Sequence, residues 1–372
     1  MRTAITFFLH STLVALMIID TSHAYQYGRE YQFYFYKYLY TSILTQVAVI
    51  DRILLYSMQY SSFIRAHINA TKIRLYLATG TPYPNVPQYP LNFRNVRFYL
   101  YTRKNPDIPQ ILYAGDSKRR LLLAGFDPQL ETVIYCHGYN RTFDDSASNF
   151  TSSLLPRKDV NIIIVVWDSY TFFDGFYVIF STIFKLADVI ANFVETLIFA
   201  GADRKKMNLM GLSDGAQAVA LAAKKIHPRV ARLTVFDPVG DFFNFLPPTQ
   251  RVSIGDADYV QIIHCTISKE GLRPQIKGDI TFYMNGAIIQ PQCANYTDVT
   301  IIAYCSHVTC NSYLNESLKK NDTLMGIKCA GFLSRYPKDY DFSDKVILTY
   351  DVPTKFKGSY CVNTDYPPPP VF

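Results

Sequence analysis

Short apolar runs recur along the chain from residue 96 and alternate with longer helical patterns. The first run alternates polar and apolar residues with the period of two that is typical of a strand. Strands are expected in the runs at residues 96–102, 132–136, 161–167, 208–210, 232–236 and 259–264. Helical patterns lie between them, at residues 146–155, 172–200 and 215–225. This alternation predicts a mainly parallel sheet that is covered by helices on both faces.

The helical pattern at residues 172–200 is long and apolar, so we compare it with a transmembrane span. It contains three ionisable residues, Lys185, Asp188 and Glu195, together with Asn192. Ionisable groups are costly in the hydrocarbon core of a bilayer. We therefore predict that this segment is a buried helix packed across the sheet.

The N-terminus resembles a secretory signal peptide. A basic start is followed by an apolar run from Ile5 to Ile19 and a small-x-small ending at Ala24. The alternative is an uncleaved membrane anchor, but the apolar run is short and the ending suits cleavage. We predict a signal peptide over residues 1–24, a secreted, extracellular protein, and no transmembrane span once the signal is removed.

Residues 25–92 form a predicted N-terminal extension that is rich in tyrosine. Within it, residues 38–66 carry apolar side chains at helical spacing, which predicts one or two amphipathic helices covering part of the main domain. A membrane-surface helix is the alternative, although the polar face is poor in Lys and Arg. A proline-rich linker at residues 80–90 follows. We place the main domain at residues 93–352 and a C-terminal tail at residues 353–372.

Composition narrows the possible partners. The chain has 372 residues, 49% of them hydrophobic, so it has ample material for a core. Its net charge is +7, but no Lys/Arg cluster is dense enough to predict nucleic-acid binding. Weak attraction to anionic lipid surfaces remains open. Protein partners are not predicted.

Sequons and cysteines accord with secretion. Asn-x-Ser/Thr sequons permit glycosylation in a secreted protein. Glycans are expected on Asn69, Asn149, Asn295, Asn315 and Asn321. The seven cysteines should be oxidised outside the cell, and at least one lacks an intramolecular partner because the number is odd.

The stretch with the clearest chemistry is Gly-Leu-Ser-Asp-Gly at residues 211–215, between a predicted strand and the Ala-rich helix at residues 215–225. Gly211 and Gly215 flank Ser213, and small residues there let the strand turn sharply and lift the serine hydroxyl out of the sheet. The bare motif also occurs by chance. A serine nucleophile requires a base, an orienting acid and oxyanion donors as well.

We look for the acid and the base at positions later in the chain than the serine, because the chain order in this arrangement is Ser, Asp, His. Asp237 ends an apolar strand, although an aspartate is also common in plain strand-end turns. His264 and His307 are the histidines that follow it. His264 lies inside an apolar strand, which favours a structural role. His307 lies in a segment that we expect to be a loop pinned by Cys305 and Cys310, and a rigid loop suits a general base.

Oxyanion donors are expected from the backbone amides of Tyr139 and Asp214. Asp214 directly follows the candidate nucleophile. Tyr139 follows His137-Gly138 at the exit of the strand at residues 132–136, where glycine allows close backbone approach. The alternative for this stretch is a tight strand exit without a chemical role.

Taken in order, these motifs resemble the animal neutral lipase family, which includes pancreatic-type lipases, insect lipase-like proteins and venom A1-type phospholipases. The resemblance runs from about residue 96 to 351. It rests on an opening strand at residues 98–103, an oxyanion loop at 137–139, a nucleophile elbow at 211–216 and an acid strand at 236–238. It also rests on a strand and turn leading to the lid, at residues 278–286 and 290–293, and on a histidine segment at residues 305–307 and 313–317. It implies an α/β-hydrolase fold with Ser213, Asp237 and His307 as catalytic triad.

The resemblance also implies a function. It predicts a serine carboxylic-ester hydrolase that acts on lipids at a membrane or lipid–water interface through an acyl-enzyme, with no metal or cofactor. Cys293 and Cys305 match the pair that closes the family's lid, and so short a lid resembles the phospholipase A1 members. Cys310 and Cys329 are expected to pair as well. The remaining cysteines, Cys136, Cys265 and Cys361, stay unassigned.

Two elbow residues depart from the family pattern. Leu212 stands where the family usually has His, and Asp214 stands where it usually has an apolar residue. The charge of Asp214 favours the N-terminus of the following helix but opposes a developing oxyanion. Because the family contains inactive yolk and binding proteins, two alternatives remain. They are a triacylglycerol lipase and a catalytically silent lipid-binding or yolk-type storage relative.

Overall fold

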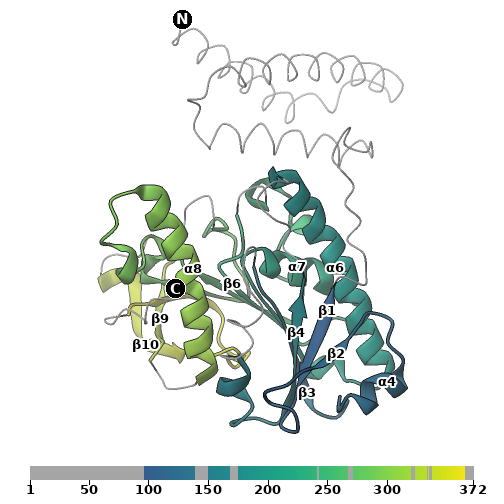
Figure 1. The fold of residues 1–372 in the computed structure, drawn as a ribbon. Helices are drawn as coiled ribbons and strands as arrows, with labels where there is room; N and C mark the ends of the chain where they lie inside the picture. Colours follow the sequence, from purple (N-terminus) through teal and green to yellow (C-terminus); the bar gives the residue numbers. More distant parts are fainter. Residues whose placement is uncertain are drawn as a thin grey trace, which may run out of the picture. The chain divides into compact units, whose positions relative to one another are not determined.

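A large, mainly parallel sheet forms the centre of the domain in this computed structural model. Among the described residues its strands follow the order β10-β9-β11-β8-β7-β6-β5-β3-β4-β1-β2 (Figure 1). The structure describes residues 96–138, 150–167, 175–240, 243–266, 271–319, 323–332, 334 and 337–364. The predicted signal peptide at residues 1–24 and the whole of the extension and linker at residues 25–92 therefore lie outside the described residues.

The middle of the sheet is parallel and its edges are antiparallel. The parallel strands are β3 (Glu131–Cys136), β4 (Val160–Val166), β5 (Met207–Leu212), β6 (Arg232–Phe236), β7 (Tyr259–His264), β8 (Ile280–Met284) and β11 (Gly358–Val362). The antiparallel strands are β1 (Arg97–Tyr101), β2 (Gln110–Leu112), β9 (Met325–Cys329) and β10 (Tyr340–Ile347). Parallel strands must be connected by crossovers, which is why helices lie on both faces.

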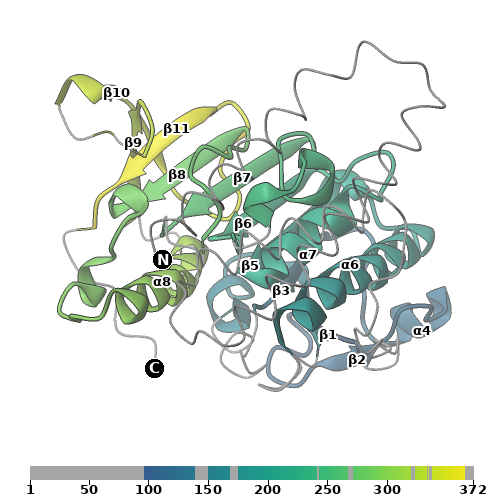
Figure 2. The ribbon, with the colours of Figure 1, turned by 90° about the horizontal axis from the view of Figure 1, so that it is seen from above.

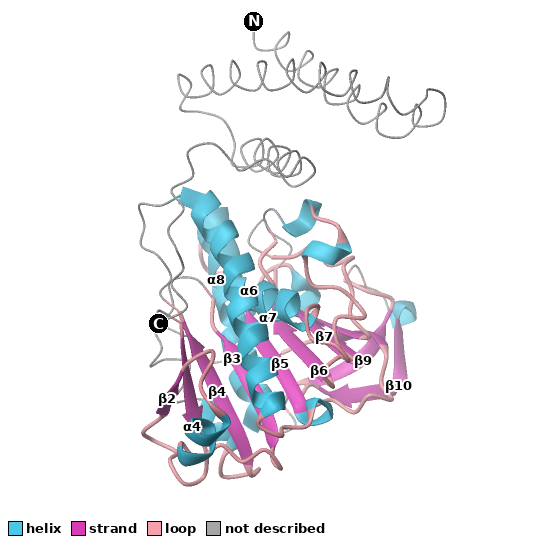
Figure 3. Ribbon diagram, turned by 90° about the vertical axis from the view of Figure 1, so that its right-hand side faces the viewer, coloured by secondary structure: helices cyan, strands magenta, loops and turns pink. Residues whose placement is uncertain are grey.

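Helices cover the two faces of the sheet. They are α4 (Lys118–Leu123), α6 (Gly175–Phe199), α7 (Asp214–Ala223) and α8 (Val299–Lys319). Seen from above, α8 lies on one side of the sheet, and α6 and α7 lie on the other (Figure 2). Figure 3 shows α6 and α7 lying in front of the strands. This arrangement is the predicted α/β-hydrolase fold, which is thereby confirmed.

Each face of the sheet has its own hydrophobic core, because successive strand residues point to opposite sides. Ile134 and Leu209 belong to the core beneath α6 and α7. Their neighbours Val133 and Met210 belong to the other core, where Tyr313 of α8 is also buried. The central strands are therefore predominantly apolar on both faces, as is typical of parallel strands that are buried on both sides.

The long apolar segment before residue 200 is a helix packed on the sheet, as predicted. The ring of Phe193 in α6 stacks on Phe98 of β1 with ring centroids 3.7 Å apart. Asp188 lies on the exposed side of the helix and pairs with Lys225. Within the part of the chain that the structure describes, no helix is both long and apolar enough to cross a membrane.

The predicted C-terminal boundary at residue 352 is wrong. Residues 358–362 form β11, which lies between β8 and β9 inside the sheet rather than in a tail. Its side chains from Ser359 to Val362 are buried. The run Ser-Tyr-Cys-Val is short and lies near a proline-rich end, so its pattern alone did not distinguish it from a tail.

Candidate active site

Ser213 stands at the sharp turn between β5 and α7. Its backbone has φ 58° and ψ −121°, which is a strained conformation for a residue with a side chain. The amide of Ser213 donates to the carbonyl of Phe236, and the amide of Val239 donates to the carbonyl of Ser213, at 3.1 Å each. These bonds hold the turn against the end of β6 and present the serine hydroxyl above the sheet.

Glycines make this turn possible because the backbone approaches itself closely. A β-carbon on Gly215 would lie 2.2 Å from the carbonyl oxygen of Cys136, and one on Gly211 would lie 2.6 Å from the carbonyl oxygen of Gly215. A β-carbon on Gly138 would lie 2.7 Å from the β-carbon of Ser213. The exit of β3 therefore runs directly beside the serine, as the predicted oxyanion role of that segment requires.

Ser213, His307 and Asp237 form one hydrogen-bonded chain. The hydroxyl of Ser213 donates to Nε2 of His307 at 2.7 Å, and Nδ1 of His307 donates to Oδ2 of Asp237 at 2.6 Å. All three candidates from the sequence thus come together from three distant segments. The geometry is suited to removing the serine proton while the carboxylate orients the imidazole and stabilises its protonated form.

The carboxylate of Asp237 is fully buried and both of its oxygens are used. Oδ1 accepts from the backbone amides of Cys265 at 2.8 Å and Thr266 at 3.2 Å, which follow the end of β7. This leaves Oδ2 for His307. The two amide donors fix the direction of the carboxylate.

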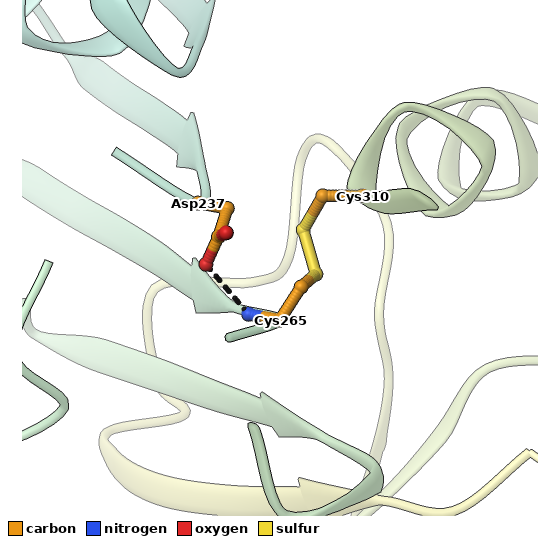
Figure 4. Close-up of side chains that lie close together, drawn as sticks. All are labelled: Asp237, Cys265 and Cys310. Atoms are coloured by element: carbon orange, nitrogen blue, oxygen red, sulfur yellow. Dashed lines mark hydrogen bonds between the residues drawn. A yellow bond between two sulfur atoms is a disulfide. The ribbon is translucent and has the colours of Figure 1, made fainter. Parts of the chain in front are cut away.

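A disulfide joins the acid's surroundings to the helix that carries the base. Cys265 is bonded to Cys310 of α8, close to the Asp237 carboxylate (Figure 4). The potential metal-ligating atoms of these three residues lie within 4.8 Å of one another. Two of those atoms are sulfurs of a disulfide, so they are not thiolate ligands.

Two expectations about this region are wrong. His307 does not lie in a loop: it lies within the long helix α8, and its side chain is buried. Cys310 does not pair with Cys329, which is bonded to Cys361 where β9 and β11 lie side by side. Cys310 instead faces the end of β7 because it lies on the same side of α8 as His307, one turn further along.

The predicted bond between Cys293 and Cys305 is present. It closes a short segment that ends two residues before His307, and α8 begins inside it at Val299. Cys136, at the end of β3, is buried and carries a free thiol. Burial raises the pKa of that thiol well above its usual range, and the nearby carboxylate of Asp214 adds to the effect.

His264 is a structural histidine, as predicted. It is fully buried in β7, its Nε2 donates to the carbonyl of Ile276 at 3.0 Å, and its ring stacks on Tyr283. Burial lowers its pKa, although Asp237 and the Ile276 carbonyl act in the opposite direction. The neutral ring therefore prevails in the folded protein near neutral pH.

The strand exit at His137 is braced from two sides. Nδ1 of His137 donates to the carbonyl of Gly138 at 2.8 Å, and the indole of Trp167 donates to the carbonyl of His137 at 3.2 Å. The two rings stack with centroids 5.7 Å apart. Burial lowers the pKa of His137. The oxyanion candidate Tyr139 lies outside the described residues.

Asp214 brings a second carboxylate to the nucleophile. It is the first residue of α7, its side chain is buried, and its Oδ2 lies 3.5 Å from the hydroxyl oxygen of Ser213. Its position at a helix N-terminus is favourable for a negative charge. Because the Asp214 carboxylate lies so close to the reacting hydroxyl of Ser213, its negative charge is unfavourable for an oxyanion that forms beside that hydroxyl.

Two glutamines that the sequence analysis did not single out support the site through hydrogen bonds. Gln290 donates to the carbonyls of Cys265 at 2.7 Å and Met284 at 2.9 Å. Gln217 donates to the carbonyl of Val239 at 2.8 Å and accepts from the amide of Val252 at 2.9 Å. After Asp214 at its first position, α7 is apolar apart from Gln217, and that contrast was the available signal.

Two of the five asparagines expected to carry glycans lie among the described residues. Asn295 is exposed in the segment before α8, and Asn315 is half-buried on α8 itself. Asn69, Asn149 and Asn321 lie outside the described residues. Glycosylation therefore stays a prediction, for which Asn295 has the most accessible described side chain.

Comparison with known proteins gives consistent matches. The model of the family described as "Lipase" matches residues 78–340. The chain is similar to lipase member H-A of Xenopus laevis, with 30% identity over 248 residues that cover 64% of this chain and 51% of the relative. It is 25% identical over 240 residues to phospholipase A1 member A of Mus musculus, again 64% of this chain and 52% of the relative. The chain thus spans about half the length of the curated relatives it matches.

Proposed function

The chain belongs to the lipase family, and from this premise we propose that it hydrolyses lipid carboxylic esters through Ser213, His307 and Asp237. The observation that carries the proposal is the unbroken hydrogen-bond chain, 2.7 Å from serine to histidine and 2.6 Å from histidine to aspartate. A silent relative does not need to keep three segments of the chain in this register. No metal or cofactor is part of the proposal.

The proposed reaction proceeds in two steps. Ser213 attacks the ester carbonyl while Nε2 of His307 accepts its proton, and the same nitrogen then protonates the leaving alcohol. Asp237 holds the imidazole and stabilises its charge. The backbone amides of Asp214 and Tyr139 are the proposed donors to the oxyanion. Water, activated by His307, then releases the fatty acid and restores the hydroxyl of Ser213.

The lid region supports a lipid substrate. Apolar side chains around the Cys293–Cys305 bond are unusually exposed, by 42% to 56%, at Ile289, Tyr296, Ile301 and Tyr304. Exposed apolar groups that gather near a site commonly mark a surface for an apolar partner. We propose a phospholipid as the preferred substrate, because the disulfide closes only a short lid that leaves room for a polar head group. The similarity to a protein named phospholipase A1 supports the same choice.

We also propose that the protein is secreted. Three disulfides among the described residues accord with an oxidising compartment. Expression in a eukaryotic cell should release a chain whose N-terminus is Tyr25 into the medium. Retention in the membrane with residues 1–24 intact would support the anchor instead.

A serine-directed fluorophosphonate tests the enzyme proposal. The wild-type protein should be labelled, Ser213→Ala should not, and Ser253→Ala, a serine away from the elbow, should be labelled as the wild type is. Folded wild-type protein that resists the reagent would favour the silent alternative. Once labelling is found, fatty-acid release from phosphatidylcholine and from triolein decides the substrate class. Faster release from triolein would favour the triacylglycerol lipase.

A further inference from the structure

The Cys265–Cys310 disulfide links two parts of the candidate site that come from distant segments of the chain. Cys265 directly follows β7, and its amide donates to Oδ1 of Asp237 at 2.8 Å. Cys310 lies in α8, three residues after His307. The bond lies beside Asp237 (Figure 4) and spans 45 residues of sequence. Both cysteines are fully buried. One covalent link therefore joins the residue that directs the acid to the helix that carries the base.

The other two described disulfides do not make this connection. The Cys293–Cys305 bond closes a local segment of 12 residues of separation, from the lid into the start of α8. The bond between Cys329 and Cys361 joins the neighbouring strands β9 and β11. Within the described residues, Cys265–Cys310 is thus the disulfide that ties α8 to the parallel strand ending beside Asp237.

A hydrogen-bonded relay through Gln290 also connects the two segments. The side-chain amide of Gln290 donates to the carbonyl of Cys265 at 2.7 Å, and its backbone amide donates to the hydroxyl of Ser306 in α8 at 3.1 Å. This relay connects the same two segments through one intermediate residue. A helix that shifts by about 1 Å would lengthen the His307–Asp237 bond, and misplacement of that size costs up to about 100-fold in rate.

We propose that the Cys265–Cys310 disulfide is a positioning element for the acid–base pair, rather than a general stabiliser of the fold. It keeps the amide of Cys265 on Oδ1 of Asp237 while it keeps His307 on Oδ2. The register between donor loop, acid and base is then set by one covalent connection. The proposal rests on the proposed function, since an acid–base pair needs a reaction to serve.

The test compares two disulfide deletions. The variant Cys265→Ala/Cys310→Ala, called the clamp variant below, removes the Cys265–Cys310 disulfide. The control variant, Cys329→Ala/Cys361→Ala, removes a bond of similar loop length away from the triad. Turnover of a soluble short-chain p-nitrophenyl ester avoids any effect of the lipid interface. In the clamp variant kcat should fall about 10- to 100-fold while KM changes by less than about threefold. In the control variant both constants should stay within about threefold of the wild type.

Two further readouts separate positioning from plain destabilisation. Loss of the oriented carboxylate weakens the stabilisation of the imidazolium of His307. The acidic limb of the pH profile of kcat/KM should therefore move to lower pH in the clamp variant alone. In ¹H NMR spectra, the low-field signal of the Nδ1 proton of His307 should weaken or vanish in that variant and persist in the control.

The outcomes are decisive in either direction. Equal losses in the two variants, or an unchanged pH profile and Nδ1 signal in a folded clamp variant, would overturn the proposal. If Cys265→Ala/Cys310→Ala does not fold, Cys265→Val/Cys310→Ala restores buried volume without the bond and takes its place. If the wild type neither hydrolyses esters nor reacts with fluorophosphonate, the proposed function fails. The Nδ1 signal then still decides whether the disulfide positions the pair.

Discussion

The two halves of the candidate site are held in place by different means. The nucleophile half consists of Ser213 and three glycines, and main-chain atoms hold it by approaching so closely that a β-carbon has no room. The base half joins Asp237, Cys265 and His307 from separate segments, through side-chain hydrogen bonds and a disulfide. The first half is specified mainly by the contiguous motif at residues 211–215, with Gly138 from the exit of β3 beside it. The second half is specified by contacts between distant segments.

This difference determines how each half should fail. Added volume damages the nucleophile half, because its close backbone contacts cannot relax without moving β3, β5 and α7 together. Loss of a bond damages the base half, because its parts are brought together only by the folded domain. Stability measurements should therefore detect changes in the first half, and kinetic measurements should detect changes in the second.

The largest effect is expected when the acid loses its charge. Asp237→Asn keeps the size of the side chain but replaces the acceptor for Nδ1 of His307 with a group that can favour the wrong tautomer. We expect kcat/KM for a short-chain ester to fall by about 10⁴-fold, with little change in thermal stability.

A second buried aspartate serves as the control for this change. Asp256 accepts from the amide of Ser253 and pairs with Lys224, away from the triad. Asp256→Asn should lower stability and leave kcat/KM within about threefold of the wild type. A similar loss of activity in both variants would show that burial of the charge, rather than its contact with His307, is what matters.

The nucleophile half should respond most strongly to Gly215→Ala. Its β-carbon would lie 2.2 Å from the carbonyl oxygen of Cys136, a backbone atom that cannot turn away. We expect a loss of about 3 kcal/mol or more in the free energy of unfolding, measured by chemical denaturation. Ser213 should lose reactivity with fluorophosphonate in parallel.

Gly115→Ala is the matched control for Gly215→Ala. Gly115 has a positive φ of 92° but no heavy atom within 4 Å of an added β-carbon. The variant should therefore cost only the backbone strain, about 1–2 kcal/mol. If Gly115→Ala is the more damaging of the two, close packing is not what makes the elbow intolerant.

The difference between the two halves also explains which parts of the site could be predicted from the sequence. Gly211, Ser213 and Gly215 form a local motif, and the strand and helix on either side are clear from their apolar patterns. Asp237 and His307 were found through chain order and family resemblance. The helical setting of His307 was missed, because α8 mixes polar and apolar residues on its faces and has no strong amphipathic pattern.

The cysteine pairs illustrate what local patterns cannot specify. Cys293 and Cys305 are close in sequence and match the lid pair of the family, so their bond was predicted. The partners of Cys310 and Cys329 depend on which strand ends lie beside α8 and β11. Six cysteines allow 15 pairings, and only the folded sheet selects among them. The short strand β11 was missed for the same reason.

Asp214→Asn tests the charge that opposes the chemistry within the nucleophile half. The carboxylate lies 3.5 Å from the hydroxyl oxygen of Ser213, so removing its charge should favour the developing oxyanion. We expect kcat to rise by up to about tenfold, while the N-terminus of α7 loses up to about 1 kcal/mol of stabilisation. Asp188→Asn, on the exposed side of α6, should change neither. A fall in kcat would instead give Asp214 a positive part in the reaction.

The smallest effect concerns the histidine that is not the base. His264 and His307 both follow Asp237 in the chain, but only His307 donates to its carboxylate, whereas His264 is buried beside Tyr283. Burial lowers the pKa of His264 below the value of about 6.5 expected in the unfolded chain. The folded state therefore binds fewer protons than the unfolded state as the pH falls below about 6.5, and stability decreases with falling pH.

Replacing this histidine should remove part of that pH dependence. His264→Gln keeps a donor for the carbonyl of Ile276 but does not titrate. Between pH 7 and pH 5.5 the wild type should lose about 1 kcal/mol more stability than the variant, measured by urea denaturation. His227→Gln, which replaces an exposed histidine, is the control variant. His137, which burial also keeps neutral, still contributes in both variants, so an unchanged slope in His264→Gln would assign the pH dependence to the nucleophile half instead.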